Sequence, residues 1–179
     1  MTKEFILAGF GGQGILFAGK MLANFGLMDG REVSWLPSYG PEMRGGTANC
    51  SVCISDKPIC SPLVTNPDIL ITMNKPSYEK FINKVKPGGM AIIDSFLVKD
   101  KCFRKDIKCF YVPATSMAAE NGISGMANII LLGRLVKETG IATAKTIRHA
   151  LEKIIPKKKS NLIELNLKAI KIGSSGSNV

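Results

Sequence analysis

The sequence predicts an α/β fold, a three-layer αβα sandwich in which a mostly parallel, partly mixed sheet lies between helices. Two observations carry this prediction. Short apolar runs, typical of buried strands, alternate along the chain with segments whose apolar residues recur at helical spacing. A glycine-rich turn also follows the first apolar run and opens the first helical segment, as in the strand-turn-helix units of parallel sheets.

Strands dominate the first part of the predicted order. The run 4–10, EFILAGF, has the continuous apolar character of a buried parallel strand, and the helix after it ends at Asp29-Gly30. Further strands are expected at 32–37, 47–55 and 68–74. The last two lie close together around the turn sequence DKP at 56–58, which indicates that part of the sheet is antiparallel.

Helices dominate the second part. A helix at 77–85 is followed by strands at 90–94 and 109–114, and the rest of the chain has helical periodicity. Four more helices are expected, at 116–122, 126–140, 142–155 and 160–173. With no internal repeat and no linker, residues 1–172 are predicted to form a single domain, and 173–179, GSSGSNV, a flexible tail.

Composition narrows the location and the class of protein. Apolar residues make up 45% of the 179 residues, which is typical of a globular domain. No apolar run approaches the ~18 residues of a membrane helix, and the N-terminus lacks the pattern of a signal peptide. We therefore expect a cytoplasmic protein with no membrane partner.

The cysteines and the histidine are not expected to form disulfides, bind a metal or act in catalysis. Five cysteines are an odd number for a disulfide framework. Cys50 and Cys53 have C-x-x-C spacing, but residues three apart on a strand point to opposite faces, so we interpret the cysteines as structural thiols and expect no metal site. His149 lies in a helical pattern and is interpreted as a surface or packing residue. No catalytic residue is assigned to the chain.

Positive charge is concentrated in the second part of the chain. Of the 24 Lys and Arg residues, 15 fall within 99–179, among them Lys157-Lys158-Lys159. These lysines either form a solvated surface or face something acidic, such as a phosphorylated cofactor or an acidic partner protein. Nucleic acid is not expected, because no aromatic residues interleave with the charges and no nucleic-acid-binding motif is present.

Gly9, Gly11 and Gly14 satisfy the pattern G-x-G-x-x-G between a strand and a helix. Such glycines let the backbone approach a ligand, and the helix N-terminus offers free N–H groups to an anion. The alternative is a tight crossover whose glycines serve packing alone. A dinucleotide fold places an acidic residue at the end of the second strand, whereas this strand ends in WLPS, which argues against NAD.

The loop PSYGPEMRGGTAN, residues 37–49, combines stiff and permissive residues around Glu42 and Arg44. The two charges either pair with each other or each face a partner, because an unpaired buried charge is costly. An arginine beside Gly45-Gly46 suits a planar anion such as a carboxylate or a phosphate. In a Rossmann-like sheet this loop would lie near the glycine turn.

Three stretches together resemble a known family: GFGGQGILFAGKMLA, PSYGPEMRGGTANCSVCIS and MANIILLGRL. They are similar, in order and spacing, to the gamma subunit of 2-oxoacid:ferredoxin oxidoreductases. The resemblance implies a Rossmann-like domain in an enzyme that oxidatively decarboxylates a 2-oxoacid to an acyl-CoA and passes electrons to ferredoxin. It also implies that thiamine diphosphate, Mg and iron–sulfur clusters lie on the alpha, beta and delta subunits, while this chain binds no cofactor alone, is inactive when isolated and helps form the site that coenzyme A approaches.

The resemblance also implies the site residues. Gly9, Gly11, Gly12, Gln13 and Gly14 match the glycine-rich turn of the family. Its Pro-Glu-x-Arg-Gly loop corresponds to Pro41, Glu42, Arg44, Gly45 and Gly46, and Asn128 matches the asparagine ahead of a Leu-Gly pair. Pro41-Glu42-Met43-Arg44-Gly45-Gly46 is closer to the 2-oxoglutarate and branched-chain types than to the pyruvate type, which favours 2-oxoglutarate; an indolepyruvate enzyme is an alternative.

Two other functions compete with this interpretation. A stand-alone NAD(P)-binding oxidoreductase would use the glycine turn and the parallel sheet. A non-catalytic interaction module would explain why the chain has no self-sufficient catalytic set. In isolation the chain could also self-associate through surfaces meant for its partners.

Overall fold

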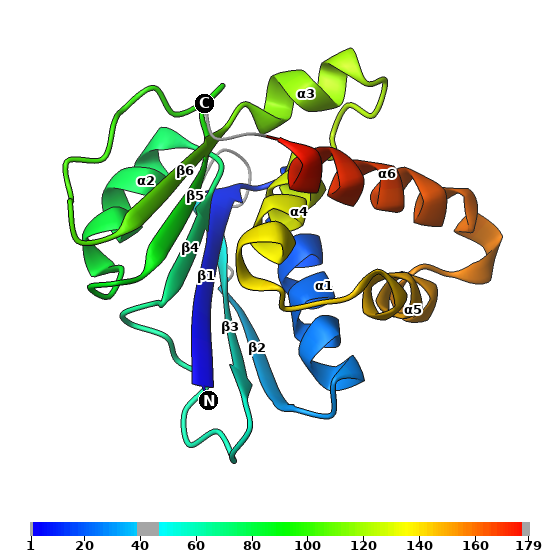
Figure 1. Cartoon of the computed structure of the whole chain (residues 1–179), viewed down its shortest axis with the longest axis horizontal. Helices are drawn as coiled ribbons and strands as arrows, with labels where there is room; N and C mark the ends of the chain where they lie inside the picture. The colour runs from blue at the N-terminus through cyan, green and yellow to red at the C-terminus, as the bar shows by residue number, and fades with distance from the viewer. Residues whose placement is uncertain (1, 39–46, 177–179) are drawn as a thin grey trace.

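The computed structural model describes residues 2–38 and 47–176. One six-stranded sheet runs through the molecule in the order β2-β3-β1-β4-β5-β6 (Figure 1). The N-terminal strand therefore occupies the middle of the sheet, with pairing partners on both sides. The strands are β1 (Thr2–Phe10), β2 (Glu32–Ser38), β3 (Thr47–Ser55), β4 (Ile69–Thr72), β5 (Met90–Asp94) and β6 (Lys108–Val112).

The sheet is mixed, as predicted, but the antiparallel strand pairs differently from the expectation. Strands β1, β4, β5 and β6 are parallel, and β3 runs antiparallel between β1 and β2. The two strands around DKP do not pair with each other, since β3 and β4 pair with opposite edges of β1. A short turn sequence was a poor guide because nine residues of β3 are matched along the whole of β1.

Helices cover the two faces of the sheet unequally. Figure 1 shows α1, α4, α5 and α6 on one side of the sheet and α2 on the other. None of the helices in the described residues combines the length and apolar character needed to span a membrane. The helices are α1 (Ile15–Met28), α2 (Lys75–Phe81), α3 (Ala114–Glu120), α4 (Ala127–Thr139), α5 (Ala144–Ile154) and α6 (Asn161–Ser175), with 3-10 turns η1 (Ile82–Lys84) and η2 (Lys157–Lys159).

Each face of the sheet has its own apolar core. The larger core joins the sheet to α1, α4, α5 and α6, with Leu7, Met21 and Leu132 fully buried in it. The smaller core lies under α2 and η1 and includes Ile6, Leu70 and Ile93. The alternation of Ile6 and Leu7 between the two cores is the period-two pattern of a strand buried on both faces.

Local sequence signals explain where the helices begin and end. The Asn74 side chain accepts a hydrogen bond from Ser77 N and caps α2, and Thr143 caps α5 in the same way. Helix α4 stops at Gly140, whose φ of 62° is left-handed. The predicted stop of the first helix is confirmed, since Asp29 is its C-cap and Gly30 follows with a φ of 70°.

Helices α4 and α6 approach each other at two glycines. A Cβ atom on Gly173 would lie 1.9 Å from the carbonyl oxygen of Ile130, and one on Gly133 would lie 2.3 Å from that of Ile170. Both contacts are with backbone, so only glycine permits this packing. Helix α6 includes residues 173–175, which the sequence assigned to a flexible tail, because Gly173 packs against α4 instead of ending the helix.

Candidate functional site

The glycine turn connects β1 to α1 at the carboxyl edge of the parallel strands. Gly12 and Gly14 adopt left-handed φ values of 94° and 73°, which explains why glycine stands at both positions. Gly11 is the first residue of the turn, and Gly14 is the N-cap of α1. The turn closes with a hydrogen bond from Gln13 N to Phe10 O, 3.2 Å long.

The Gln13 side chain joins the turn to two strands. Its Oε1 accepts a hydrogen bond from Phe10 N at 2.6 Å, and its Nε2 donates one to Met73 O at 3.2 Å, just beyond β4. Gly9 leaves room for this arrangement, since a Cβ there would lie 2.7 Å from Gln13 Oε1. Gln13 therefore fixes the shape of the turn.

Asn128 meets the turn from α4, 114 residues further along the chain. Its Nδ2 donates a hydrogen bond to Gly14 O at 2.8 Å, and the residue is 4% exposed. A Cβ on Gly14 would lie only 2.5 Å from that Nδ2. The structure thus brings Gly9, Gly11, Gly12, Gln13, Gly14 and Asn128 into one cluster.

Two hollows flank the glycine turn. One, of about 370 Å³, is bordered by Gly14, Asn128, Phe17 and Leu162, with Lys159 also in its lining; we call it the Gly14 hollow. The other, of about 290 Å³, lies beside Gly12 and Gln13 and is bordered by residues that follow β4 and β5, by α3 and by the start of α4. The turn therefore lies between two shallow hollows.

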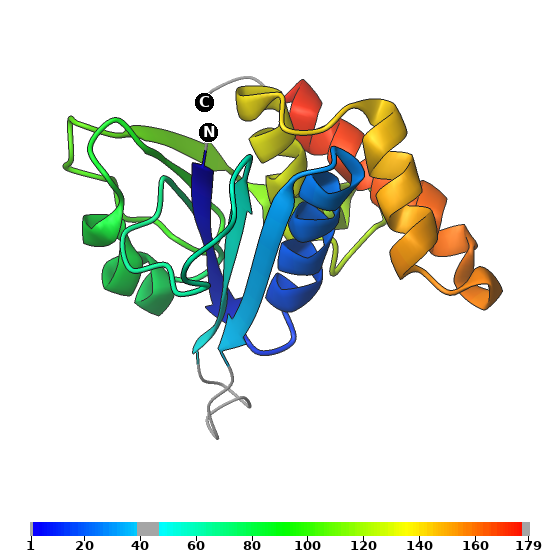
Figure 2. The same ribbon diagram turned by 90° about the horizontal axis from the view of Figure 1, so that it is seen from below.

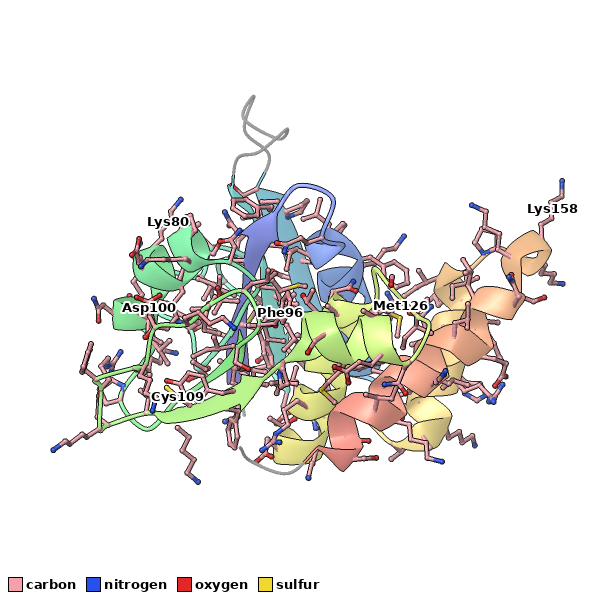
Figure 3. The ribbon with its side chains drawn as sticks, turned by 90° about the horizontal axis from the view of Figure 1, so that it is seen from above. Lys80, Phe96, Asp100, Cys109, Met126 and Lys158 are labelled. Carbon is pink, nitrogen blue, oxygen red and sulfur yellow. The ribbon has the colours of Figure 1, made fainter. Side chains whose placement is uncertain are left out.

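The electrostatics of the Gly14 hollow favour an anion. Helices α1 and α4 both begin beside it, and neither has a side-chain cap or an acidic residue in its first turn. Their free N–H groups carry partial positive charge. Lys159 adds a full charge, whereas Lys158 projects from the outer end of the helical arm formed by α5, η2 and α6 (Figure 3).

Asp94 and Thr115 belong to the same edge of the sheet and were not identified from the sequence. Asp94 is the fully buried last residue of β5; it accepts hydrogen bonds from Thr115 Oγ1 at 2.5 Å and from Phe96 N at 3.1 Å. Burial raises the pKa of its carboxyl, and these hydrogen bonds oppose the rise. In the sequence, the acidic residue that ends the apolar run MAIID was the signal that could have identified Asp94.

Glu42, Arg44, Gly45 and Gly46 lie outside the described residues, as does Pro41. The strand ends on either side of them are well defined. Thr47 pairs with Phe10 at the end of β1, and Ser38 pairs with Asn49. Thr47 therefore lies beside the strand end from which the glycine turn starts, and the contact of Glu42 and Arg44 with the turn stays a prediction.

The interpretation of the cysteines is confirmed only in part. Cys50 and Cys53 are buried, and burial raises the pKa of both thiols, that of Cys50 to about 12. Cys60 is exposed, and Cys102 and Cys109 are half-buried. Within residues 2–38 and 47–176, no three His, Cys, Asp or Glu side chains cluster as metal ligands. His149 lies on the surface of α5, as expected.

Comparison with known proteins places the fold and this turn in a family. A family model described as "Pyruvate ferredoxin/flavodoxin oxidoreductase" matches residues 4–175. The 2-oxoglutarate synthase subunit KorC of Methanocaldococcus jannaschii is 39% identical over 160 residues, covering 88% of this chain and 86% of the relative. The ketoisovalerate oxidoreductase subunit VorA of Methanothermobacter marburgensis is 37% identical over 94% of this chain.

The chain spans only 35% of the length of that VorA relative. Among solved structures, the gamma subunit of a keto/oxoacid ferredoxin oxidoreductase from Geobacter sulfurreducens superimposes with a TM-score of 0.84 at 29% sequence identity. It matches 98% of this chain and 95% of its own length. The likeness thus extends over the whole domain.

Proposed function

Because the chain belongs to the pyruvate ferredoxin/flavodoxin oxidoreductase family, we propose that it is the gamma subunit of a multi-subunit enzyme acting on a 2-oxoacid, with 2-oxoglutarate as the preferred substrate. The enzyme converts the 2-oxoacid to an acyl-CoA and passes the electrons to ferredoxin. The near full-length similarity to a subunit of 2-oxoglutarate synthase supports this choice of substrate. Thiamine diphosphate, Mg and the iron–sulfur clusters are held by the alpha, beta and delta subunits, and this chain performs no covalent step.

The role of this chain is to help form the surface that coenzyme A approaches. The Gly14 hollow carries this proposal, because it joins two uncapped helix N-termini to the Lys159 ammonium beside the glycine turn. These groups suit the phosphates of coenzyme A. Gln13 and Asn128 hold the backbone of the turn in place and leave its outer surface for the ligand.

A stand-alone NAD(P)-binding oxidoreductase fits the structure less well. A dinucleotide fold holds the ribose with a carboxylate at the end of the second strand. In this chain the carboxylate of β2, Glu32, stands at its first residue, and the strand ends in Leu36-Pro37-Ser38. The strand that pairs with β1 on one side is also β3, which runs antiparallel, whereas the sheet of a dinucleotide fold is mostly parallel.

Anaerobic purification of a tagged chain from its native cells tests the proposed function. We expect three other subunits, iron and thiamine diphosphate to co-purify, with CoA-dependent oxidation of a 2-oxoacid by a ferredoxin. Comparison of 2-oxoglutarate, pyruvate, branched-chain oxoacids and indolepyruvate as substrates identifies the enzyme. Recovery of the chain alone, with tight binding of NAD(P), would contradict the proposal.

Lys159 provides a test of the Gly14 hollow. In the assembled enzyme, Lys159→Ala is expected to raise the KM for CoA about three- to tenfold, because a partly screened ammonium–phosphate contact is lost. The kcat should change little, since no reacting atom is touched. Lys158→Ala, on the same short turn but outside the hollow, is the matched control. Equal effects of the two substitutions would show that only general surface charge matters.

Glu42 and Arg44 are proposed to organise the same surface together with Gly45-Gly46. Arg44→Ala should then either weaken assembly with the other subunits or raise the KM for CoA, since a guanidinium fork binds carboxylates and phosphates. Subunit content by gel filtration separates the two effects. Full assembly with unchanged kinetics would contradict the proposed role of Arg44 at this surface.

A further inference from the structure

The face of the sheet opposite α1 is hollowed over its antiparallel half. A groove of about 580 Å³ lies there between β2 and β3 on one side and α2 with η1 on the other. Figure 2 shows β2 and β3 beside α1, with α2 on the other side of the sheet, where it packs against β1 and β4. We call this the β3 groove and use six of its residues: Ile6, Leu36, Leu63, Lys80, Phe81 and Lys84.

The β3 groove has a buried floor and exposed apolar walls. Ile6 and Phe81 are 3% and 6% exposed, whereas Leu36 is 39% and Leu63 is 62% exposed. Leu36 lies on β2 and Leu63 in the segment between β3 and β4, and both leucines face solvent. Apolar side chains gathered in one groove are typical of an interaction site.

Two lysines border the groove. Lys80 and Lys84 are one helical turn apart, with Nζ atoms 5.3 and 5.6 Å from the centre of the Phe81 ring. Neither forms an ion pair within residues 2–38 and 47–176; the neighbouring carboxylate of Glu79 pairs with Lys75. Figure 3 shows Lys80 projecting outward from α2.

We propose that the β3 groove is the docking site for an acidic segment of another subunit, an inference that rests on the proposed function. The segment places an apolar side chain against Leu36 and Leu63, and two carboxylates about one helical turn apart against Lys80 and Lys84. Apolar contact supplies the burial, and the charges fix the register of the segment.

A second copy of this chain fits the groove poorly. In a symmetric dimer the same patch meets itself, so Lys80 and Lys84 would face the lysines of the other copy. Like charges placed together across an interface oppose association. A segment with carboxylates opposite Lys80 and Lys84 fits the patch better than a second copy does.

Binding of the purified chain to a complex of the other three subunits tests the groove. Lys80→Glu/Lys84→Glu is expected to raise the Kd about tenfold or more at low ionic strength, because attraction is replaced by repulsion. Leu63→Ser should raise it several-fold, and added salt should weaken binding of the unaltered chain. The matched controls are Lys157→Glu/Lys158→Glu, with the same change of charge, and Phe103→Ser, at a side chain 94% exposed outside the groove.

The possible outcomes distinguish failure of the docking proposal from failure of the proposed function. Failure of the unaltered chain to assemble would overturn the proposed function and this inference with it. Normal assembly with equal Kd values for the groove variants and the controls would overturn the groove alone. A change confined to self-association, measured by sedimentation, would identify a second copy as the occupant and contradict the acidic segment. Thermal unfolding of each variant confirms that the fold is intact.

Discussion

Replacement of Gly173 by alanine is expected to lower the free energy of unfolding by about 3 kcal/mol, although alanine is the better helix former. The added Cβ would lie 1.9 Å from Ile130 O and 3.0 Å from Arg134 N. These are backbone atoms of a packed helix, so α4 and α6 must separate along their contact. Thermal unfolding followed by circular dichroism should show a Tm lower by about 10 °C for a domain of this size.

Lys171→Ala on the same helix is the control for Gly173→Ala. Lys171 is exposed, so its replacement should change the Tm by no more than a degree or two. Gly133→Ala should behave like Gly173→Ala, since its Cβ would meet the backbone of α6. An unchanged Tm for both glycine variants would mean that the two helices do not pack this closely.

Gly14→Ala is expected to destabilise the domain by about 2–3 kcal/mol and to reduce acyl-CoA formation by the assembled enzyme. Two effects add: alanine resists a φ of 73°, at a cost of roughly 1–2 kcal/mol, and its Cβ would overlap Asn128 Nδ2 at 2.5 Å. Urea unfolding of the purified chain measures the loss of stability, and steady-state kinetics with CoA measures the loss of acyl-CoA formation.

Gly12→Ala and Asn128→Ala separate the cost of the left-handed backbone from the cost of the overlap with Asn128. Gly12 has a φ of 94° but open space around a Cβ, so its replacement isolates the backbone cost. In an Asn128→Ala background the overlap disappears, and Gly14→Ala should then cost only about as much as Gly12→Ala, a coupling of about 1 kcal/mol. Strict additivity of Gly14→Ala and Asn128→Ala would contradict the contact between them.

The sequence was a good guide to the elements and a weaker one to their pairing. Alternation of apolar runs with helical periodicity depends on local spacing, and it located each strand and helix to within a few residues. The partners of β3 are β1 on one side and β2 on the other, and this pairing depends on tertiary contacts that no turn sequence records. The extent of α6 was missed because Gly173 has the appearance of a helix stop.

The glycine turn could be predicted because its motif is contiguous. Asn128 came only from the family resemblance, since nothing near it in the sequence indicates contact with Gly14. In the sequence Lys159 is one lysine in a charged run, and only its place in the lining of the Gly14 hollow distinguishes it from Lys158. The sequence shows that Asp94 ends an apolar run. It does not show that Asp94 is buried against Thr115, because that contact depends on how α3 packs.

The position of β1 in the sheet has a consequence for the order of folding. Its pairs with β3, and those of β3 with β2, lie within the first 55 residues, so these three strands and α1 can pair before the rest of the chain has been made. Strand β4 then pairs with the other edge of β1, and β5 and β6 follow outward from β4, each after a connection whose closure costs loop entropy. On the ribosome, the N-terminal third can thus serve as a template on which the rest of the chain assembles as it emerges.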